Sequence, residues 1–325
     1  MGMGELLKVL GRGLGRGLGR GPLGVAGPSL GWPSLGWAGL GLRLLSWGAL
    51  GGLGLYGTIA LGLWLFQGRY IFFPDRQWKQ TPQDWGWSYE DLWIGEEGRR
   101  LHGWWIPQDN PQAPVLIYFH GNEGNISHNL HRMAFFRSLG LQIMAVDYRG
   151  YGHSSPPFPQ EQRLYEDGQA ILTYAVVQRQ WDPRRVVIYG HSLGGAIALN
   201  AVVASRQPWA GLVIEGSFTS LLAMAHHARK FTYLPLGWIL HQRFASLEKV
   251  PRLQVPVLLV HGTGDRTVPY TMSEELYRAA PNPKVLALIP GVDHDITASP
   301  QGEHIQILGD FLQQIGLKTG VIPER

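Results

Sequence analysis

A short apolar strand that runs into a helix through a glycine-flanked serine constrains the fold of this chain more than any other feature. Residues 186–195 read Val-Val-Ile-Tyr-Gly-His-Ser-Leu-Gly-Gly, and Ala-Ile-Ala-Leu follows as a helical stretch. Gly190 and Gly194 permit a sharp turn and close packing of strand and helix, with the Ser192 hydroxyl facing outward. The helix N-terminus adds free N–H groups and a positive partial charge beside that hydroxyl. The segment predicts a nucleophile elbow.

A serine hydroxyl is a poor nucleophile until a base takes its proton, so a histidine held by a carboxylate is needed further along the chain. An apolar strand at 255–262 leads into a loop that carries Asp265, and a strand at 284–290 leads into a loop that carries His294. We interpret His294 as the base and Asp265 as the carboxylate that orients it. Three other carboxylates remain as alternatives for that role, namely Asp293, Asp295 and Glu215.

The oxyanion of a tetrahedral intermediate needs a pair of N–H donors. The backbone amide of Leu193, directly after the serine, is the first. The second is expected in the loop after the strand at 115–119, where a His-Gly-Asn turn makes Asn122 the preferred donor and Glu123 the alternative. His120, at a strand end before glycine, is expected to shape this loop by hydrogen bonding and not to take part in the chemistry.

Taken together, these motifs resemble the α/β-hydrolase superfamily. In chain order they are His120-Gly121-Asn122, Asp147-Tyr148-Arg149-Gly150-Tyr151-Gly152, Gly190-His191-Ser192-Leu193-Gly194-Gly195, Phe218-Thr219-Ser220, His261-Gly262-Thr263-Gly264-Asp265 with Val268-Pro269, and Asp293-His294. Within the superfamily the chain is similar to serine aminopeptidase-like hydrolases, bud-emergence-type proteins and animal membrane-bound hydrolase-domain proteins, some of which remove palmitate from proteins. The resemblance covers about residues 88–316 and implies the triad order Ser, Asp, His. Asp293 departs from it, because glycine is expected before the histidine.

The rest of this region alternates apolar strands with helical stretches, a pattern typical of an α/β fold with a mostly parallel sheet and helices on both faces. An antiparallel hairpin of 91–98 and 99–107 opens the region. The further strands are expected at 115–120, 141–147, 185–190, 211–216, 255–262 and 284–290, and the helices at about 127–139, 161–179, 193–206, 271–280 and 302–316. This is enough chain for one α/β-hydrolase domain over 88–316 with a sizeable core.

Segment 218–254 lies where such folds often carry a lid, and no large closed lid is expected from its length. It is rich in large apolar side chains, namely Phe231, Tyr233, Leu234, Leu236, Trp238 and Ile239, around Pro235 and Gly237. One interpretation is an amphipathic helix packed on the sheet, and the other is an apolar wall for an acyl chain.

No metal site or cofactor is expected. His226 and His227 are adjacent, and adjacent side chains on a helix point about 100° apart, so the two do not easily face one ion. The chain has no cysteine, which also excludes disulfides, and it lacks the His-Glu-x-x-His spacing of many zinc enzymes.

The N-terminal residues form a different physical regime. Residues 1–46 are a low-complexity tail rich in Gly, Arg and Leu, and residues 47–67 carry no charge over about the ~20 residues that cross a bilayer as a helix. Trp47 and Trp64 suit the two membrane interfaces. No small-residue cleavage site follows, so an uncleaved transmembrane anchor is predicted. Residues 317–325 are assigned to a C-terminal tail.

Basic residues precede this helix in larger number than acidic ones, which favours an N-terminus inside the cell and a catalytic domain on the non-cytoplasmic side of a single-pass membrane protein. The net charge of +4 is explained largely by arginines in the tail, so nucleic acid is not expected as a partner.

The sequence therefore predicts a membrane-anchored serine hydrolase that transfers an acyl group in two steps. An anchor and an apolar cap favour small-molecule or acylated, lipid-like esters and thioesters as substrates. A serine peptidase or amidase uses the same triad and is the alternative reaction. A non-catalytic binding protein of the same fold at the membrane is the alternative of another class.

Overall fold

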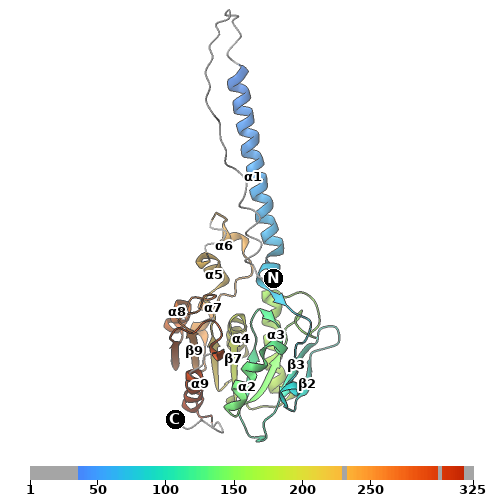
Figure 1. Ribbon diagram of the computed structural model, residues 1–325, viewed down its shortest axis with the longest axis vertical. Coiled ribbons are helices and arrows are strands. Elements are labelled where there is room, and N and C mark those ends of the chain that lie inside the picture. The colour runs from blue at the N-terminus through green and yellow to red at the C-terminus, as the bar shows by residue number, and fades with distance from the viewer. Residues whose placement is uncertain (1–35, 229–232, 299–301, 318–325) are drawn as a thin grey trace, which may run out of the picture. The chain divides into compact units, whose positions relative to one another are not determined.

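The computed structural model describes residues 36–228, 233–298 and 302–317, and its centre is an eight-stranded sheet (Figure 1). The strand order is β10-β9-β8-β7-β4-β6-β3-β2. Their bounds are β2 Glu90–Ile94, β3 Leu101–Ile106, β4 Val115–Phe119, β6 Gln142–Val146, β7 Val186–His191, β8 Gly211–Glu215, β9 Val257–Gly262 and β10 Lys284–Ile289. The β2–β3 and β3–β6 pairs are antiparallel and the other pairs are parallel. The predicted mostly parallel sheet with an opening hairpin is confirmed.

Helices cover both faces of this sheet. The longer ones are α2 Leu130–Ser138, α3 Glu161–Thr173, α4 Leu193–Ser205, α8 Thr271–Ala279 and α9 Glu303–Gln314. One hydrophobic layer contains side chains from α3, α4 and α8, and the other contains side chains from α2 and α9. Along β7, Val186 and Ile188 belong to the first layer and Val187 and Tyr189 to the second. Because the inner strands β4, β7, β8 and β9 are buried on both faces, they read as nearly continuous apolar runs, whereas the edge strand β2 alternates exposed and buried residues.

Short elements complete the chain. A second sheet pairs β1 (Phe73–Pro74) with β5 (Glu123–Gly124) in parallel. The 3-10 helices are η2 Pro82–Trp85, η3 Ile126–Asn129, η5 Pro183–Arg185, η6 Val250–Arg252 and η7 Ile296–Ala298, and α3 continues as one π-helical turn, η4, at Tyr174–Gln178. The helix predicted at 161–179 is therefore one path of chain with two hydrogen-bonding patterns.

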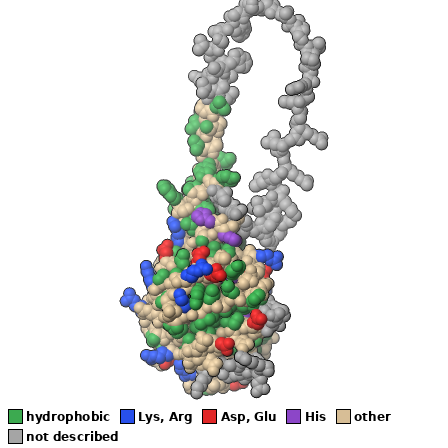
Figure 2. Space-filling view, turned by 90° about the vertical axis from the view of Figure 1, so that its left-hand side faces the viewer, with side chains coloured by type: hydrophobic (Ala, Val, Ile, Leu, Met, Phe, Trp, Pro, Cys, Tyr) green, Lys and Arg blue, Asp and Glu red, His purple; other side chains and the backbone are tan. Residues whose placement is uncertain are grey.

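The N-terminal helix α1 spans Gly36–Ile71, and its part Leu45–Ile71 is long and apolar enough to cross a membrane. Large hydrophobic side chains are exposed along that part, with glycines between them (Figure 2). The chain divides into two units, Met1–Leu55 and Tyr56–Arg325. Of the first unit, the structure describes only residues 36–55, which belong to α1. The predicted repeats of the tail, most of the C-terminal tail and Phe231 lie outside the described residues.

Segment 218–254 differs from the expected amphipathic helix on the sheet. In its described part it contains the short α-helices α5 Leu221–His227, α6 Leu236–Ile239 and α7 Ser246–Lys249. Pro235 caps α6, and the chain leaves this helix after one turn. Side chains that a sheet-packed helix would bury are open to solvent, since Tyr233 is 92 % and Trp238 90 % exposed. The interpretation of one amphipathic helix packed on the sheet is wrong.

Candidate active site

Ser192 lies between β7 and α4 in a backbone conformation that L-residues rarely adopt. Its φ is 54° and its ψ −119°. A Cβ atom at Gly190 would lie 2.4 Å from the Gly194 carbonyl oxygen, and one at Gly194 would lie 2.1 Å from the Phe119 carbonyl oxygen. Strand and helix can approach this closely only because both positions are glycine. The predicted strand, turn and helix are therefore present, with the serine at the turn.

Two hydrogen bonds from the neighbouring strand end hold Ser192 in this conformation. Its backbone N–H donates to the Glu215 carbonyl oxygen at 2.8 Å, and the Ser217 hydroxyl donates to the Ser192 carbonyl oxygen at 2.8 Å. The end of β8 thus fixes the turn that follows β7.

Asp265 and His294 meet at the carboxyl ends of β9 and β10. The Asp265 Oδ2 atom is 2.6 Å from His294 Nδ1, and it also lies 3.0 Å from His261 Nε2. Its Oδ1 atom accepts the Thr267 and Val268 backbone N–H groups at 2.7 and 2.8 Å. Burial by itself raises the pKa of Asp265, but these hydrogen bonds outweigh it and hold the pKa well below its usual range. The carboxylate is ionised and its orientation is fixed.

The three alternative carboxylates point elsewhere. Asp293 accepts the backbone N–H groups of Arg266 and His294 and is exposed, while Asp295 and Glu215 pair with Arg132 at 2.8 and 2.7 Å. In the described part of the chain, Asp265 is the only carboxylate within hydrogen-bonding distance of the His294 ring. The geometry favours Asp265 as the residue that orients the imidazole.

The loop of His294 packs against the turn of Ser192. The His191 and His294 ring centroids are 4.8 Å apart, and a Cβ atom at Gly216 would lie 3.3 Å from His294 Cε1. Gly216 therefore leaves the space that the imidazole fills. Within the described residues Ser192 Oγ makes no hydrogen bond, so the structure brings the loops of Ser192 and His294 together without a direct bond between the two side chains. Such bonds are often long in a free enzyme and shorten when substrate is bound.

The amides predicted for the oxyanion flank Ser192 from two sides. Leu193 begins α4, and the Gly121 backbone lies so close that a Cβ there would be 3.7 Å from Ser192 Cβ. Among the described residues, the backbone N–H groups of Leu193 and Asn122 have no acceptor, so both can donate to a bound oxyanion. The Asn122 carbonyl oxygen is held by Phe73 N–H and the Tyr151 hydroxyl, both at 3.0 Å.

His120 is buried and shapes the loop, as expected. Its Nδ1–H donates to the Gly121 carbonyl oxygen at 2.8 Å, and its Nε2 lies 3.4 Å from Asp147 Oδ1. Burial lowers the pKa of His120 to about 4 and raises the pKa of Asp147 to about 8. Because Nδ1 carries the proton of the neutral ring, Nε2 can only accept, which suits a protonated Asp147 carboxyl. Both groups are uncharged at neutral pH.

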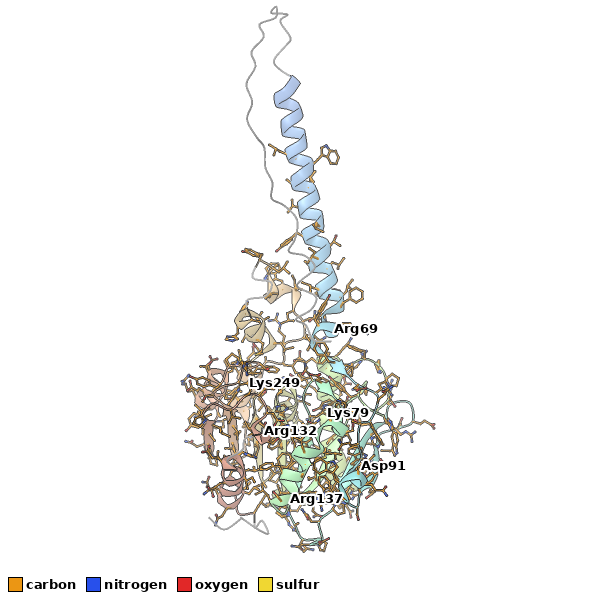
Figure 3. The ribbon with its side chains drawn as sticks, viewed as in Figure 1. Arg69, Lys79, Asp91, Arg132, Arg137 and Lys249 are labelled. Atoms are coloured by element: carbon orange, nitrogen blue, oxygen red, sulfur yellow. The ribbon has the colours of Figure 1, made fainter. Side chains whose placement is uncertain are left out.

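Arg132 was missed by the sequence analysis. It lies on α2 inside the domain (Figure 3), only 2 % exposed, and its guanidinium contacts Glu215, Asp295 and, at 3.2 Å, His191 Nε2. Burial alone lowers the pKa of Arg132, but the neighbouring carboxylates, Glu215 first, raise it overall. The arginine therefore ties α2 to the end of β8 and to the residue after His294. Its signal in the sequence is a charge four residues before Phe136, on the face of the helix that is buried.

His261 was also missed as a partner. It is fully buried, and its ring lies between the Ser273 hydroxyl at 2.6 Å and the Asp265 carboxylate at 3.0 Å. The histidine thus contacts the same Asp265 oxygen, Oδ2, as His294 does. Its signal was its fixed place before the glycine of the Asp265 loop.

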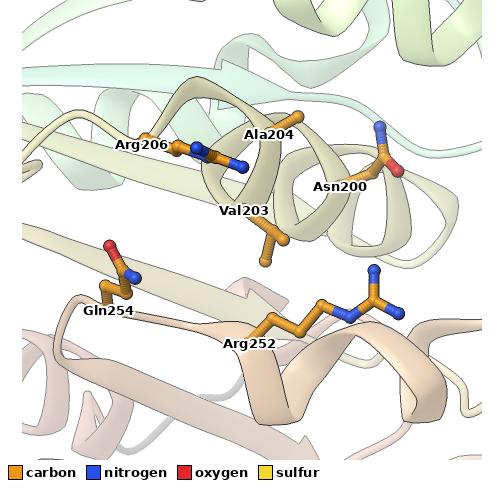
Figure 4. Close-up of a pocket in the computed structure, with 6 residues that line it drawn as sticks. All are labelled: Asn200, Val203, Ala204, Arg206, Arg252 and Gln254. Atoms are coloured by element: carbon orange, nitrogen blue, oxygen red, sulfur yellow. The ribbon is translucent and has the colours of Figure 1, made fainter.

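The structure describes no arrangement for a metal at this site. Among the described residues, no group of three or more His, Asp or Glu side chains is placed to hold an ion. A cavity of about 560 Å³ lies elsewhere, at the C-terminal end of α4, where Asn200, Arg206 and Arg252 surround it (Figure 4). Since α4 has 13 residues and rises about 1.5 Å per residue, this cavity is roughly 15–20 Å from Ser192. It is not part of the candidate site.

Comparison with known proteins identifies the family of the chain. The model of the prolyl oligopeptidase family matches residues 127–315. Uncharacterized protein Rv2307c of Mycobacterium tuberculosis is 33 % identical over 81 % of this chain and 92 % of that protein. Alpha/beta hydrolase domain-containing protein WAV2 of Arabidopsis thaliana is 29 % identical over 71 % of this chain and 82 % of its own length.

A solved structure shows the same fold. The esterase Pf2001 of Pyrococcus furiosus superposes with a TM-score of 0.60 at 22 % sequence identity, covering 75 % of this chain and all of the esterase. At this identity the likeness shows that the two chains share the fold.

Asp147→Asn should make the protein more resistant to unfolding at higher pH. The pKa of this carboxyl is about 8 in the folded protein and about 3.9 in the unfolded chain. The free energy of unfolding therefore falls as the pH rises between those values. An amide cannot ionise, so the variant should gain on the wild type by up to about 1.4 kcal/mol per pH unit in that window. Urea unfolding of the full chain in detergent at pH 5 and pH 8 measures the difference. Asp109→Asn, the same change at an exposed position, should follow the wild type; equal pH dependence in the Asp147 variant would show that Asp147 is ionised in the native state.

Proposed function

This chain belongs to the prolyl oligopeptidase family within the α/β-hydrolase superfamily, and from that premise we propose that it is a membrane-anchored serine hydrolase of acylated or lipid-like esters and thioesters. The observation that carries the proposal is the 2.6 Å contact between Asp265 and His294, on a loop that packs against the strained turn of Ser192. An esterase fold neighbour and the family's peptidase description both support hydrolysis.

The proposed mechanism assigns one task to each group. His294 takes the Ser192 proton, and Ser192 attacks the carbonyl carbon of the ester or thioester. The N–H groups of Leu193 and Asn122 donate to the oxyanion, and Asp265 keeps the proton of the neutral imidazole on Nδ1. His294 then protonates the departing alcohol or thiol. Water activated by the same base releases the acid from the acyl-enzyme.

Ser192→Ala should abolish turnover of a short p-nitrophenyl ester and labelling by a fluorophosphonate, because the variant lacks the nucleophile. Intact-mass analysis of the full chain should show one adduct on the wild type and none on the variant, with circular dichroism as the check that both are folded. A folded wild type that takes no adduct would favour a non-catalytic binding protein, and a variant that still turns over ester would refute the role of Ser192.

Asp265→Asn should lower kcat for the same ester by about 10²–10⁴-fold, since an amide can favour the wrong imidazole tautomer. Asp293→Asn and Asp295→Asn are matched controls on the neighbouring loop and should each cost less, because neither carboxylate contacts the His294 ring. The comparison needs only kcat at saturating ester. A larger loss at either control would move the orienting role to that residue.

A serine peptidase or amidase of the same fold is the second candidate. The match to the prolyl oligopeptidase family favours it. The triad proposed above can attack an amide as well as an ester. A p-nitroanilide with the same acyl group as the ester distinguishes the two reactions by the ratio of their kcat/KM values.

Anchoring by α1 is also part of the proposal, with the domain on the non-cytoplasmic side. The apolar length of Leu45–Ile71 supports a single span, and the arginines of the tail support the orientation.

A full chain with alkaline phosphatase fused to its C-terminus, expressed in a bacterium, should stay with membranes in alkaline carbonate and show phosphatase activity. Replacing Arg12, Arg16 and Arg20 by Gln should reduce that activity, because the positive charges that retain the N-terminus inside are lost. A phosphatase that is inactive while a green fluorescent protein fusion is bright would place the domain in the cytoplasm.

A further inference from the structure

A cavity of about 180 Å³ lies between the C-terminal turns of α1 and the short helices α5 and α6. Leu63 and Ile71 line it from α1, Leu221 and Ala225 from α5, and Ile239 from α6. Resting on the proposed function, we propose that this cavity holds the acyl chain of the ester or thioester substrate, so that the anchor helix itself forms one wall of the binding site.

The lining suits a hydrocarbon chain. Apart from Gln67 and the Tyr70 hydroxyl, the side chains around the cavity are aliphatic. The Gln67 amide is already satisfied, because its Nε2 donates to the Ile239 carbonyl oxygen at 3.2 Å and its Oε1 accepts the backbone N–H groups of His241 and Gln242 at 3.1 and 3.0 Å. An occupant therefore meets few free polar groups and gains from burying apolar surface.

Two residues that line the cavity, Ile71 and Leu221, are connected to the loops beside Ser192. The Ile71 carbonyl oxygen accepts a hydrogen bond from Asn122 Nδ2 at 2.8 Å, and Asn122 is a proposed oxyanion donor. On the other side, α5 begins at Leu221, four residues after Ser217, whose hydroxyl binds the Ser192 carbonyl oxygen. The wall of the cavity is thus continuous with the loops that flank Ser192.

The surroundings of the cavity point to a bilayer as the source of that chain. Leu63 and Ile71 belong to the apolar segment Leu45–Ile71. The Tyr56 hydroxyl donates to the Tyr233 carbonyl oxygen at 3.0 Å, so the residues before α6 lie beside α1. Trp238 on α6 is 90 % exposed. Exposed Trp and Tyr are typical of side chains at a membrane interface. An acyl chain can pass from the lipid into the cavity without crossing water.

The volume sets the expected chain length. On a scale of roughly 30 Å³ for a group the size of a water molecule, 180 Å³ accommodates about six carbons. Burying one methylene group is worth roughly fourfold in binding. The wild type should therefore prefer a hexanoyl over an acetyl ester.

Leu63→Trp fills the cavity from α1, and Leu65→Trp is its matched control. Two residues are about 200° apart on a helix, and Leu65 is 56 % exposed, so the control side chain faces away. For the full chain in detergent, we expect the ratio of kcat/KM for p-nitrophenyl hexanoate over acetate to fall at least tenfold in Leu63→Trp. It should stay within twofold of the wild type in Leu65→Trp.

A second pair tests the opposite wall. Ala225→Trp fills the cavity from α5, and Ala228→Trp makes the same change at an exposed position just after that helix. This pair decides the question if Leu63→Trp does not fold.

The outcomes separate the two proposals. A wild type without acetate turnover and without a fluorophosphonate adduct would overturn the proposed function and the inference with it. An active wild type whose hexanoate to acetate ratio is unchanged by the folded cavity-filling variants would overturn the inference alone.

Discussion

The structure of the candidate site depends on the backbone contact between the start of α4 and the end of β4. Gly194 lies so close to the Phe119 carbonyl oxygen that no side chain fits between them, and this contact forces the chain to turn at Ser192. A non-glycine residue at positive φ costs of the order of 1–3 kcal/mol. Hydrogen bonds to Glu215 and from Ser217 offset that cost. Buried hydrogen bonds thus stabilise the strained turn, which places Ser192 beside the N-terminus of α4.

The loop of His294 depends on a buried ion pair, that of Arg132 with Glu215. Arg132 joins Glu215, in the core, to Asp295, the residue after His294, so that the loop of the base is held from α2. Breaking a buried pair by removing one partner typically costs about 3–5 kcal/mol, because the other charge is left unpaired. The position of the His294 ring therefore depends on two contacts. Asp265 binds the ring directly, and Arg132 of α2 binds the next residue, Asp295.

The sequence predicted the sheet, its helices and the meeting of three loops, because strands that are buried on both faces and glycine-flanked turns are local signals. It favoured Asp265 because this residue lies in a loop after an apolar strand and completes the chain order Ser, Asp, His. The structure adds that its strand, β9, pairs with β10, the strand before His294. Arg132 and Gln67 could not be found in the same way. Each forms its contacts with residues far away in the chain, and no periodicity within the segment indicates the partner. Pro235 and its neighbours likewise read as apolar cover for the sheet, whereas they pack beside α1.

Gln67 connects helix α1 with the backbone of residues 239–242. A polar side chain at the end of an apolar helix is costly unless it is satisfied within the protein. Here the backbone of 239–242 forms the hydrogen bonds that satisfy Gln67. Because losing them would leave the buried amide unpaired, they hold segment 239–242 against α1. Two turns of helix thereby become part of the domain, and the chain that leaves them bonds directly to the loop of Asn122. Because the same residues end the apolar part of α1 and bond to the loop of Asn122, the position of the helix and the geometry of the candidate active site are set together.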